Sequence, residues 1–320
     1  MQRREILSTL AGAGAAGAAG MLSAVTSTWA QSAKTTSTKR AVAPFIQARD
    51  GTQLYWTQWG EGRPILFLNG ANLTTQMWDY QMVAFADQGY RCIAFDRRGH
   101  GRSDRPLGGY DYDTFADDVA SVITALDLRD LTVVAHSMGG GEIVRYLTRH
   151  GSARVARIVL LGSTTPYLLK TADNPNGVPA SAFEAVRASW RKDFPKWVAD
   201  NTAPFFNPET SPALMQQLAA LMMQCSVPTA IECQKALTAT DFRPDLARIT
   251  VPVLVIHGDR DVSAPLALTG KPTAELIPGG RLKIYPGAPH GLMYTHMELL
   301  TDDIQQFIGA TPLKTANGAN

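Results

Sequence analysis

Short apolar runs alternate with longer segments of helical periodicity along most of the chain. Asp50-Gly51 stands between the first two apolar runs and is a strong β-hairpin signal. The predicted strands cover residues 46–49, 53–56, 64–68, 91–95, 131–135, 155–161, 252–257 and 281–285. The predicted helices of the core cover residues 78–88, 112–126, 142–150 and 291–308. This alternation predicts an α/β fold with a mostly parallel, eight-stranded sheet and helices on both faces.

One long segment breaks the alternation. From about residue 165 to residue 245 the pattern shows only helical stretches, over 181–197 and 211–225. The segment lies between two predicted strands of the core, so it should sit over the carboxyl edge of the sheet. Ligands bind at that edge in open α/β sheets. We therefore expect a helical lid above a ligand site.

The first 30 residues have a different pattern. Arg3-Arg4 precedes a weakly hydrophobic Ala/Gly-rich stretch over 10–25, and residues 28–30 offer a small-x-small cleavage site. This pattern is typical of a twin-arginine export signal, with a plain disordered tail as the alternative. It predicts export by the twin-arginine machinery to the periplasm or beyond. The stretch is too short and glycine-rich for a stable membrane span.

Three further features of the ends follow. Residues 12–17 match G-x-G-x-x-G, but no strand precedes them, so we reject a dinucleotide site there. A Ser/Thr/Lys-rich linker is expected over 31–43 and a C-terminal tail over 311–320. The folded domain is expected over 44–310.

Composition narrows the classes of function. The chain has 320 residues, 45% hydrophobic and 18% charged, with a formal net charge of +2, which is typical of a globular protein without a nucleic-acid partner. Cys92 is expected in the core. Cys225 and Cys233 could be joined by a disulfide in an oxidising compartment, or stay free. The spacing of these residues fits no metal site, and oligomeric state has no signal in the sequence.

The strongest chemical signal is V-A-H-S-M-G-G-G at residues 134–141, between a predicted strand and a helix. Ser137 has small residues two positions before and after it, Ala135 and Gly139, which allow a tight turn. Such a strand-turn-helix serine is typical of a nucleophile elbow, whose strained backbone exposes the hydroxyl. A Ser/Gly-rich loop is the alternative interpretation.

Suitable partners for this serine follow in the chain. A serine hydroxyl needs a base, and the base needs an orienting carboxylate. Asp259 and Asp261 follow the strand at 252–257, and His290 follows the strand at 281–285. The order Ser, Asp, His is the one expected for a hydrolase of this sheet architecture. The other histidines are less well placed: His100, His136, His150, His257 and His296.

Four motifs make the resemblance specific: DRRGHGRSD at 96–104, YDTFADD at 112–118, the elbow with its triple glycine, and APHG at 288–291. With them, residues 44–165 and 240–310 resemble the α/β-hydrolase superfamily. More narrowly, the chain is similar to the cofactor-free bacterial haloperoxidase and arylesterase (perhydrolase) family. The resemblance implies that Asp261 is the acid, with Asp259 as the fallback, and that no cofactor is needed.

The resemblance also implies an oxyanion hole made by the backbone N–H groups of Ala71 and Met138. The chain departs from the family pattern twice: Asn69 replaces the usual histidine, and Asn72 stands where proline is frequent. Asn69 can still hold the loop by hydrogen bonds. The missing proline implies weaker support for peracid chemistry than for hydrolysis. Ala71 replaces a frequent aromatic residue, which should leave more room beside the acyl group.

Apolar and polar residues after this loop are candidates for the acyl pocket, although a place in the core fits them equally well: Asn72, Leu73, Met77 and Trp78. The expected function is that of a serine carboxylesterase, which hydrolyses small or aryl carboxylic esters through an acyl-enzyme. A perhydrolase or haloperoxidase that uses hydrogen peroxide is the alternative and would share every catalytic residue. A non-catalytic binding protein on the same fold is the third possibility.

Overall fold

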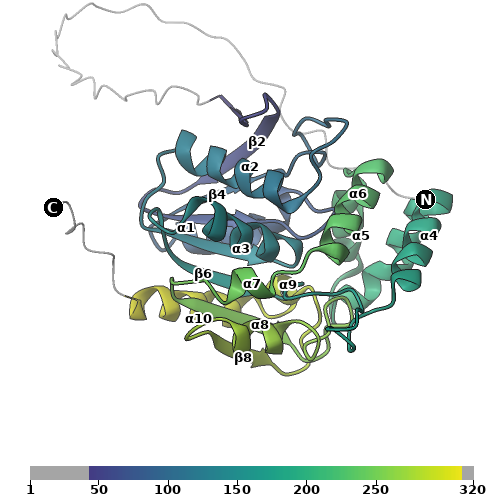
Figure 1. The fold of residues 1–320 in the computed structure, drawn as a ribbon. Coiled ribbons are helices and arrows are strands. Elements are labelled where there is room, and N and C mark those ends of the chain that lie inside the picture. The colour runs from purple at the N-terminus through teal and green to yellow at the C-terminus, as the bar shows by residue number, and fades with distance from the viewer. Residues whose placement is uncertain (1–42, 312–320) are drawn as a thin grey trace, which may run out of the picture. The chain divides into compact units, whose positions relative to one another are not determined.

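The computed structural model describes residues 43–311, and eight strands there form one sheet in the order β1-β2-β4-β3-β5-β6-β7-β8 (Figure 1). The first two strands and the β2–β4 pair are antiparallel, and all other neighbours are parallel. The predicted fold class is therefore confirmed. The strands are β1 Phe45–Gln47, β2 Gln53–Trp59, β3 Arg63–Leu68, β4 Tyr90–Phe95, β5 Leu131–His136, β6 Val155–Leu161, β7 Val253–Gly258 and β8 Arg281–Tyr285.

The central strands are covered on both faces, which explains their continuous apolar runs. Every residue of β5, β6 and β7 is buried. In β3, Ile65 and Phe67 contribute to one core cluster, and Leu66 and Leu68 contribute to another. Side chains alternate between the faces of a strand, so this short segment supplies both layers.

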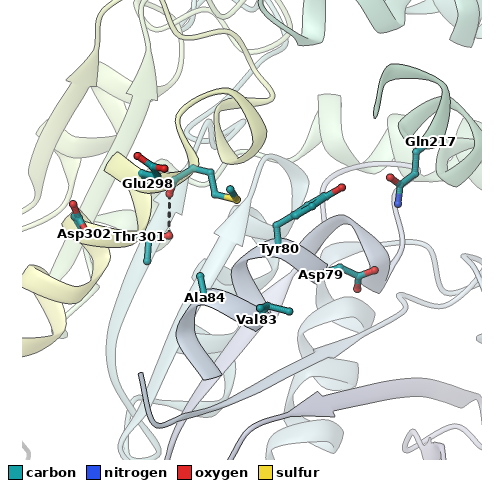
Figure 2. A pocket seen from close by; sticks show the side chains of 9 residues that line it. Asp79, Tyr80, Val83, Ala84, Gln217, Glu298, Thr301 and Asp302 are labelled. Atoms are coloured by element: carbon teal, nitrogen blue, oxygen red, sulfur yellow. Dashed lines mark hydrogen bonds between the residues drawn. The ribbon is translucent and has the colours of Figure 1, made fainter. Parts of the chain in front are cut away.

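Two helices cover one face, α1 Asp79–Ala86 and α10 Met297–Ala310. A short 3-10 turn, Thr75–Trp78, leads into α1, and a short helix α9, Leu292–Thr295, precedes α10. The expected helix over 291–308 is thus divided at His296, whose φ of −132° and ψ of 38° are not helical. Side chains of α1 and α10 line a surface hollow of about 630 Å³ (Figure 2).

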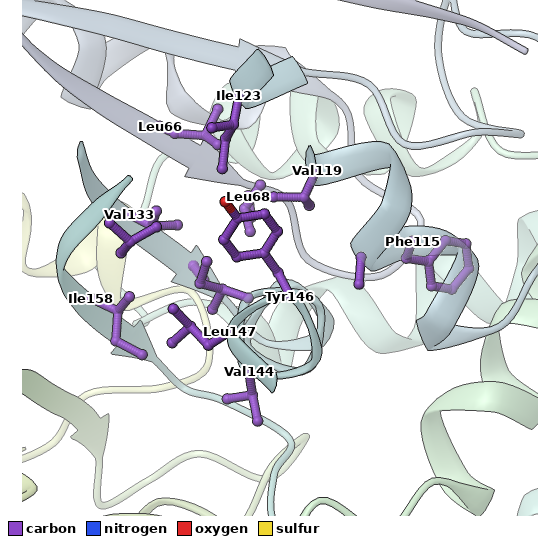
Figure 3. Close-up of a cluster of buried hydrophobic side chains, with 14 of the residues drawn as sticks. Leu66, Leu68, Phe115, Val119, Ile123, Val133, Val144, Tyr146, Leu147 and Ile158 are labelled. Atoms are coloured by element: carbon purple, nitrogen blue, oxygen red, sulfur yellow. The ribbon is translucent and has the colours of Figure 1, made fainter. Parts of the chain in front are cut away.

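The other face is covered by α2 Tyr112–Ala125, α3 Met138–His150 and α8 Gly270–Leu276. Figure 3 shows side chains of α2 and α3 meeting those of the strands beneath them. The helix predicted over 142–150 begins four residues earlier than expected, at Met138. The triple glycine is therefore the first turn of α3, where Gly139 allows the helix to lie against the β3 end at Leu68.

The segment predicted as a lid is helical and lies between β6 and β7. Its helices are α4 Ala180–Thr202, a 3-10 turn Ala203–Phe205, α5 Pro212–Met222, α6 Val227–Ala239 and α7 Arg243–Leu246. The backbone of α4 is interrupted at Asp193, just before Pro195, whose ring a continuous helix would not accommodate. A small apolar cluster around Trp190 and Phe194 holds these helices together.

Two earlier expectations concern the cysteines and the ends of the chain. Cys225 and Cys233 are buried free thiols, so the disulfide alternative is not realised. The export signal, the linker up to residue 42 and the tail from residue 312 lie outside the described residues and stay predictions. Within the part of the chain that the structure describes, no helix is both long enough and apolar enough to cross a membrane.

Candidate active site

Ser137 lies in the tight turn between β5 and α3. Its φ of 53° is in the left-handed region that side chains rarely adopt, so the turn is strained as a nucleophile elbow requires. The turn is fixed by its backbone: Ser137 N–H donates to the Leu161 carbonyl (2.9 Å), and the Ser137 carbonyl accepts from Gly140 N–H (3.0 Å). A Cβ on Gly139 would lie 2.9 Å from the Leu68 carbonyl oxygen, so only glycine fits there without a shift.

The structure brings Ser137, His290 and Asp261 together from the carboxyl ends of β5, β8 and β7. His290 Nε2 lies 3.0 Å from Ser137 Oγ, and His290 Nδ1 lies 2.6 Å from Asp261 Oδ2. An ionised carboxylate can only accept, so Nδ1 carries the proton and Nε2 is left to accept from the serine hydroxyl. All three residues are buried.

Asp261 is held as a carboxylate. Its Oδ1 accepts from the N–H groups of Ser263 (2.9 Å) and Ala264 (2.7 Å). Burial alone would raise the pKa of Asp261, but the interaction with His290 and the hydrogen bonds of His257, His290 and Ala264 bring it well below its usual range. The fallback acid, Asp259, instead accepts from the exposed Gly287 N–H (2.7 Å), as a loop cap.

His136, directly before the nucleophile, lies against His290. Its Nε2–H donates to the His290 carbonyl (3.1 Å), and the two rings are 4.6 Å apart. Burial and the neighbouring His290 hold the pKa of His136 well below its ordinary value, so the ring is neutral. His257 donates from Nε2 to the Ala264 carbonyl (2.7 Å), beside Asp261. His136 and His257 therefore hold the backbone next to His290 and Asp261 in place.

The remaining histidines have other partners. His100 is buried, bonds the Arg98 carbonyl, and has a pKa lowered to about 3, mainly by burial. His150 pairs with Asp117 at the end of α3, and His296 bonds Thr295. None of the three has a hydrogen bond to Ser137 or Asp261 among those of the described residues.

A cavity of about 400 Å³ opens on Ser137 between the sheet edge and the helices that follow β6. The lid segment supplies most of its walls. Its aromatic and apolar lining includes Leu73, Leu168, Phe183, Val186, Trp190, Trp197, Phe205, Leu218, Met222 and Leu237. Such a space suits an apolar group of moderate size.

Two of the four candidate pocket residues line this cavity, Asn72 and Leu73. Trp78 does not, which corrects that expectation. It is fully buried, and its indole N–H donates to Asn69 Oδ1 (3.0 Å), so it supports the loop from behind. Met77 is likewise a core residue. The Asn69 side chain also donates to the Phe95 carbonyl (2.9 Å), so it holds the loop by hydrogen bonds as expected.

The two predicted oxyanion donors come from different segments: one lies in the Asn69–Asn72 loop and one directly after the nucleophile. Ala71 lines the cavity together with Ser137. Met138 is the first residue of α3, so its N–H has no acceptor within the helix, and the positive end of the helix dipole lies there.

Two residues of the site were not singled out from the sequence. Arg97 is buried and donates to the backbone carbonyls of Asn69 (2.7 Å) and Gly70 (3.3 Å). Phe205, in the lid segment, packs edge-on against the His290 ring at 5.4 Å, and its carbonyl accepts from Gly291 N–H (2.9 Å). Only the DRRGHGRSD motif carried a signal for Arg97, and nothing in the sequence pattern pointed to Phe205.

The hollow of Figure 2 is larger but contains none of the predicted site residues. Its polar groups are mostly the carboxylates of Asp79, Glu298 and Asp302, with Tyr80 between them. Among residues 43–311, the structure shows no group of three or more His, Cys, Asp or Glu side chains that could hold a metal ion.

The sequence and the structure of this chain are similar to those of known proteins. Residues 63–297 match the family described as the alpha/beta hydrolase fold. The chain is 40% identical over 254 residues to a non-heme chloroperoxidase of Kitasatospora aureofaciens, which covers 78% of this chain and 92% of that protein. It is 35% identical over 272 residues to a bifunctional esterase/perhydrolase of Acinetobacter calcoaceticus, with 82% and 99% covered. Among solved structures, an esterase from Exiguobacterium antarcticum superposes with a TM-score of 0.81 at 32% identity, covering 84% and 100%.

Proposed function

The chain belongs to the α/β-hydrolase fold family, within its haloperoxidase/perhydrolase branch, and on that premise we propose that it is a serine hydrolase acting on small carboxylic esters. The observation that carries the proposal is the pair of hydrogen bonds that joins Ser137 to His290 and His290 to Asp261. A neutral imidazole beside the hydroxyl is the base that a serine nucleophile needs.

In this proposal the Ser137 hydroxyl attacks the ester carbonyl while its proton passes to His290 Nε2. Asp261 holds the imidazole in place and offsets the positive charge that forms on it. The N–H groups of Ala71 and Met138 stabilise the oxyanion. His290 then protonates the departing alcohol, which leaves an acyl group on Ser137. The apolar cavity would hold that acyl group.

The acceptor of the acyl group decides between two activities. Water activated by His290 gives a carboxylic acid, as in an esterase. Hydrogen peroxide in the same place gives a peracid and regenerates the serine hydroxyl, as in a perhydrolase. The non-heme haloperoxidases and the bifunctional esterase/perhydrolase among the relatives support peroxide as a second acceptor, although Asn72 replaces the frequent proline. We propose both acceptors. The relatives support hydrogen peroxide, and hydrolysis by water needs no residue beyond the proposed triad and oxyanion donors.

The test is Ser137→Ala with p-nitrophenyl esters of graded acyl length, measured with and without hydrogen peroxide. We expect a loss of kcat of about a million-fold, because the members of such a triad act as a unit. Labelling by a fluorophosphonate should also disappear, while the circular dichroism spectrum should match the wild type.

A mutant that still labels stoichiometrically would show that another residue is the nucleophile. A wild-type protein that neither labels nor turns over any ester would favour a binding protein on this fold. Peracid released only when peroxide is present, and measured by halide oxidation, would support the second acceptor.

A further inference from the structure

We propose that Arg97 is a positioning residue that orients and polarises the peptide between Gly70 and Ala71, whose N–H is the proposed oxyanion donor. This inference rests on the proposed function, because it concerns the same oxyanion. Arg97 follows β4 and is buried beside the Asn69–Asn72 loop. In the sequence it lies far from the residues around Ser137.

The orientation follows from the planarity of the peptide. Arg97 Nη1 donates to the Gly70 carbonyl (3.3 Å), and Nη2 donates to the Asn69 carbonyl (2.7 Å). In a trans peptide the C=O and N–H bonds point in opposite directions. With its carbonyl oxygen directed at Arg97, this peptide turns the Ala71 N–H the other way. Gly70, Ala71 and Ser137 line one cavity, so that direction leads towards the reacting group.

The guanidinium also changes the strength of the donor. A hydrogen bond from a cation to a carbonyl is stronger than a neutral one and polarises the amide, which makes its N–H a better donor. The other oxyanion donor, the Met138 N–H, is strengthened in a different way. The carbonyl of its peptide, that of Ser137, accepts from the neutral N–H groups of Gly140 (3.0 Å) and Thr164 (3.4 Å). Arg97 thus does for Ala71 what the helix dipole of α3 does for Met138.

Glu142 keeps the buried cation in place. Its carboxylate, on the first turns of α3, accepts a hydrogen bond from Arg97 Nε. Burial alone would lower the pKa of Arg97, but the charge of Glu142 raises it above the ordinary value, so Arg97 stays protonated. The ion pair therefore joins the helix behind Ser137 to the loop in front of it.

Arg98 offers a matched control for a purely structural role. It is the next residue, equally buried, and it forms an ion pair with Asp118 through two hydrogen bonds (2.6 and 2.7 Å). The hydrogen-bond partners of its side chain among the described residues, Asp50 and Asp118, lie outside the Asn69–Asn72 loop. A variant that removes one partner would leave a buried charge unpaired, so both partners are replaced together.

The experiment compares Arg97→Met/Glu142→Leu with Arg98→Met/Asp118→Leu. Each is assayed for ester hydrolysis and for binding of a trifluoromethyl ketone, which forms an oxyanion adduct with the nucleophile. We expect the first double variant to lose about 10- to 50-fold in kcat, less than the ~10²–10³-fold for deleting a donor outright. Its KM should change less than threefold, since the ground-state ester carries no oxyanion. Ketone affinity should fall in parallel with kcat, and the Arg98 control should change each quantity less than twofold.

Arg97→Lys keeps the cation but has a single donor group, and it covers the case in which the double variant does not fold. We expect it to lose about fivefold in kcat and in ketone affinity together. If the variants keep both quantities within twofold of wild type, or if the Arg98 control falls equally, Arg97 has no such role. A wild-type protein that fails to bind the ketone would instead overturn the proposed function itself.

Discussion

The two sides of the proposed oxyanion site are built in opposite ways. On the elbow side, backbone conformation does the work: Ser137 takes a left-handed φ, and α3 starts at the next residue with glycines in its first turn. On the loop side, buried side chains do it. Asn69 binds the Trp78 indole and the Phe95 carbonyl, and Arg97 binds two loop carbonyls.

This difference decides which substitutions each side tolerates and how well each side can be predicted from the sequence. The elbow is encoded within eight consecutive residues, because a tight turn depends on neighbours in the chain. The loop depends on residues at the ends of β3 and β4, in the 3-10 turn before α1, and in α3. Substitutions at positions far away in the sequence can therefore weaken the loop side, whereas the elbow depends mainly on residues 134–141 themselves.

The largest effect on stability should come from Asn69→Ala on the loop side. The substitution leaves the Trp78 N–H and the Phe95 carbonyl buried without partners, at about 1–3 kcal/mol for each group. We expect the free energy of unfolding, measured in urea, to fall by roughly 2–4 kcal/mol, and kcat to fall with it. Asn201→Ala is the control for the change in stability, because the Asn201 amide donates to the Trp197 carbonyl at an exposed position of α4. Equal losses in the two variants would mean that the Asn69 bonds do not hold the loop.

The next effect tests the contact between the two sides. In Gly139→Ala the new methyl group would lie 2.9 Å from the Leu68 carbonyl and 3.0 Å from the Asn69 carbonyl, so the loop has to shift. We expect a loss of about 1–3 kcal/mol in thermal or urea unfolding, together with lower kcat. Gly309→Ala in α10 is the matched control: its Cβ meets open space, so alanine should stabilise by up to about 1 kcal/mol. A Gly139→Ala enzyme with unchanged kcat would show that the two sides are independent.

The smallest effect concerns the Asp261–His290 pair, which lies outside the two oxyanion sides and depends on charge. The pKa of Asp261 is lower when folded than its unfolded value of about 3.9. Its contribution to stability is thus present above about pH 4 and is lost as the pH falls towards the folded pKa. Between pH 7 and pH 3 the free energy of unfolding, measured in urea, should fall for both proteins. For Asp261→Asn we expect the fall to be smaller than for the wild type by on the order of 1–2 kcal/mol. Parallel curves for the two proteins would refute this linkage.

Most of the fold followed from periodicity, because apolar alternation and turn residues act locally. All eight strands, the Asp50-Gly51 hairpin and the insertion between β6 and β7 lie where the pattern placed them. The start of α3 was placed too late because glycine disfavours helix, and packing overrides that preference. Gly139 lies against Leu68, and Gly141 lies against Tyr112 and Phe242.

The site was less evenly predictable. Ser137, Asp261 and His290 each follow a strand, so topology alone brings them to one edge of the sheet. The sequence left Trp78 open between the pocket and the core, because an indole in a sequence looks the same in either place. Arg97 and Phe205 depend on contacts between segments far apart in the chain, and no local pattern records such contacts.

The insertion between β6 and β7 has a consequence for engineering. The two strands are parallel neighbours, so the insertion leaves the sheet at the carboxyl end of β6, and the chain crosses to the opposite edge of the sheet before it enters β7. A donor segment from another enzyme could be grafted there as a cassette, changing the cavity walls while β5, β7 and β8 keep the nucleophile, acid and base. Besides this crossing, the graft has a second requirement. It must supply a backbone carbonyl where Phe205 now accepts from Gly291, since that bond ties the insertion to the turn bearing His290.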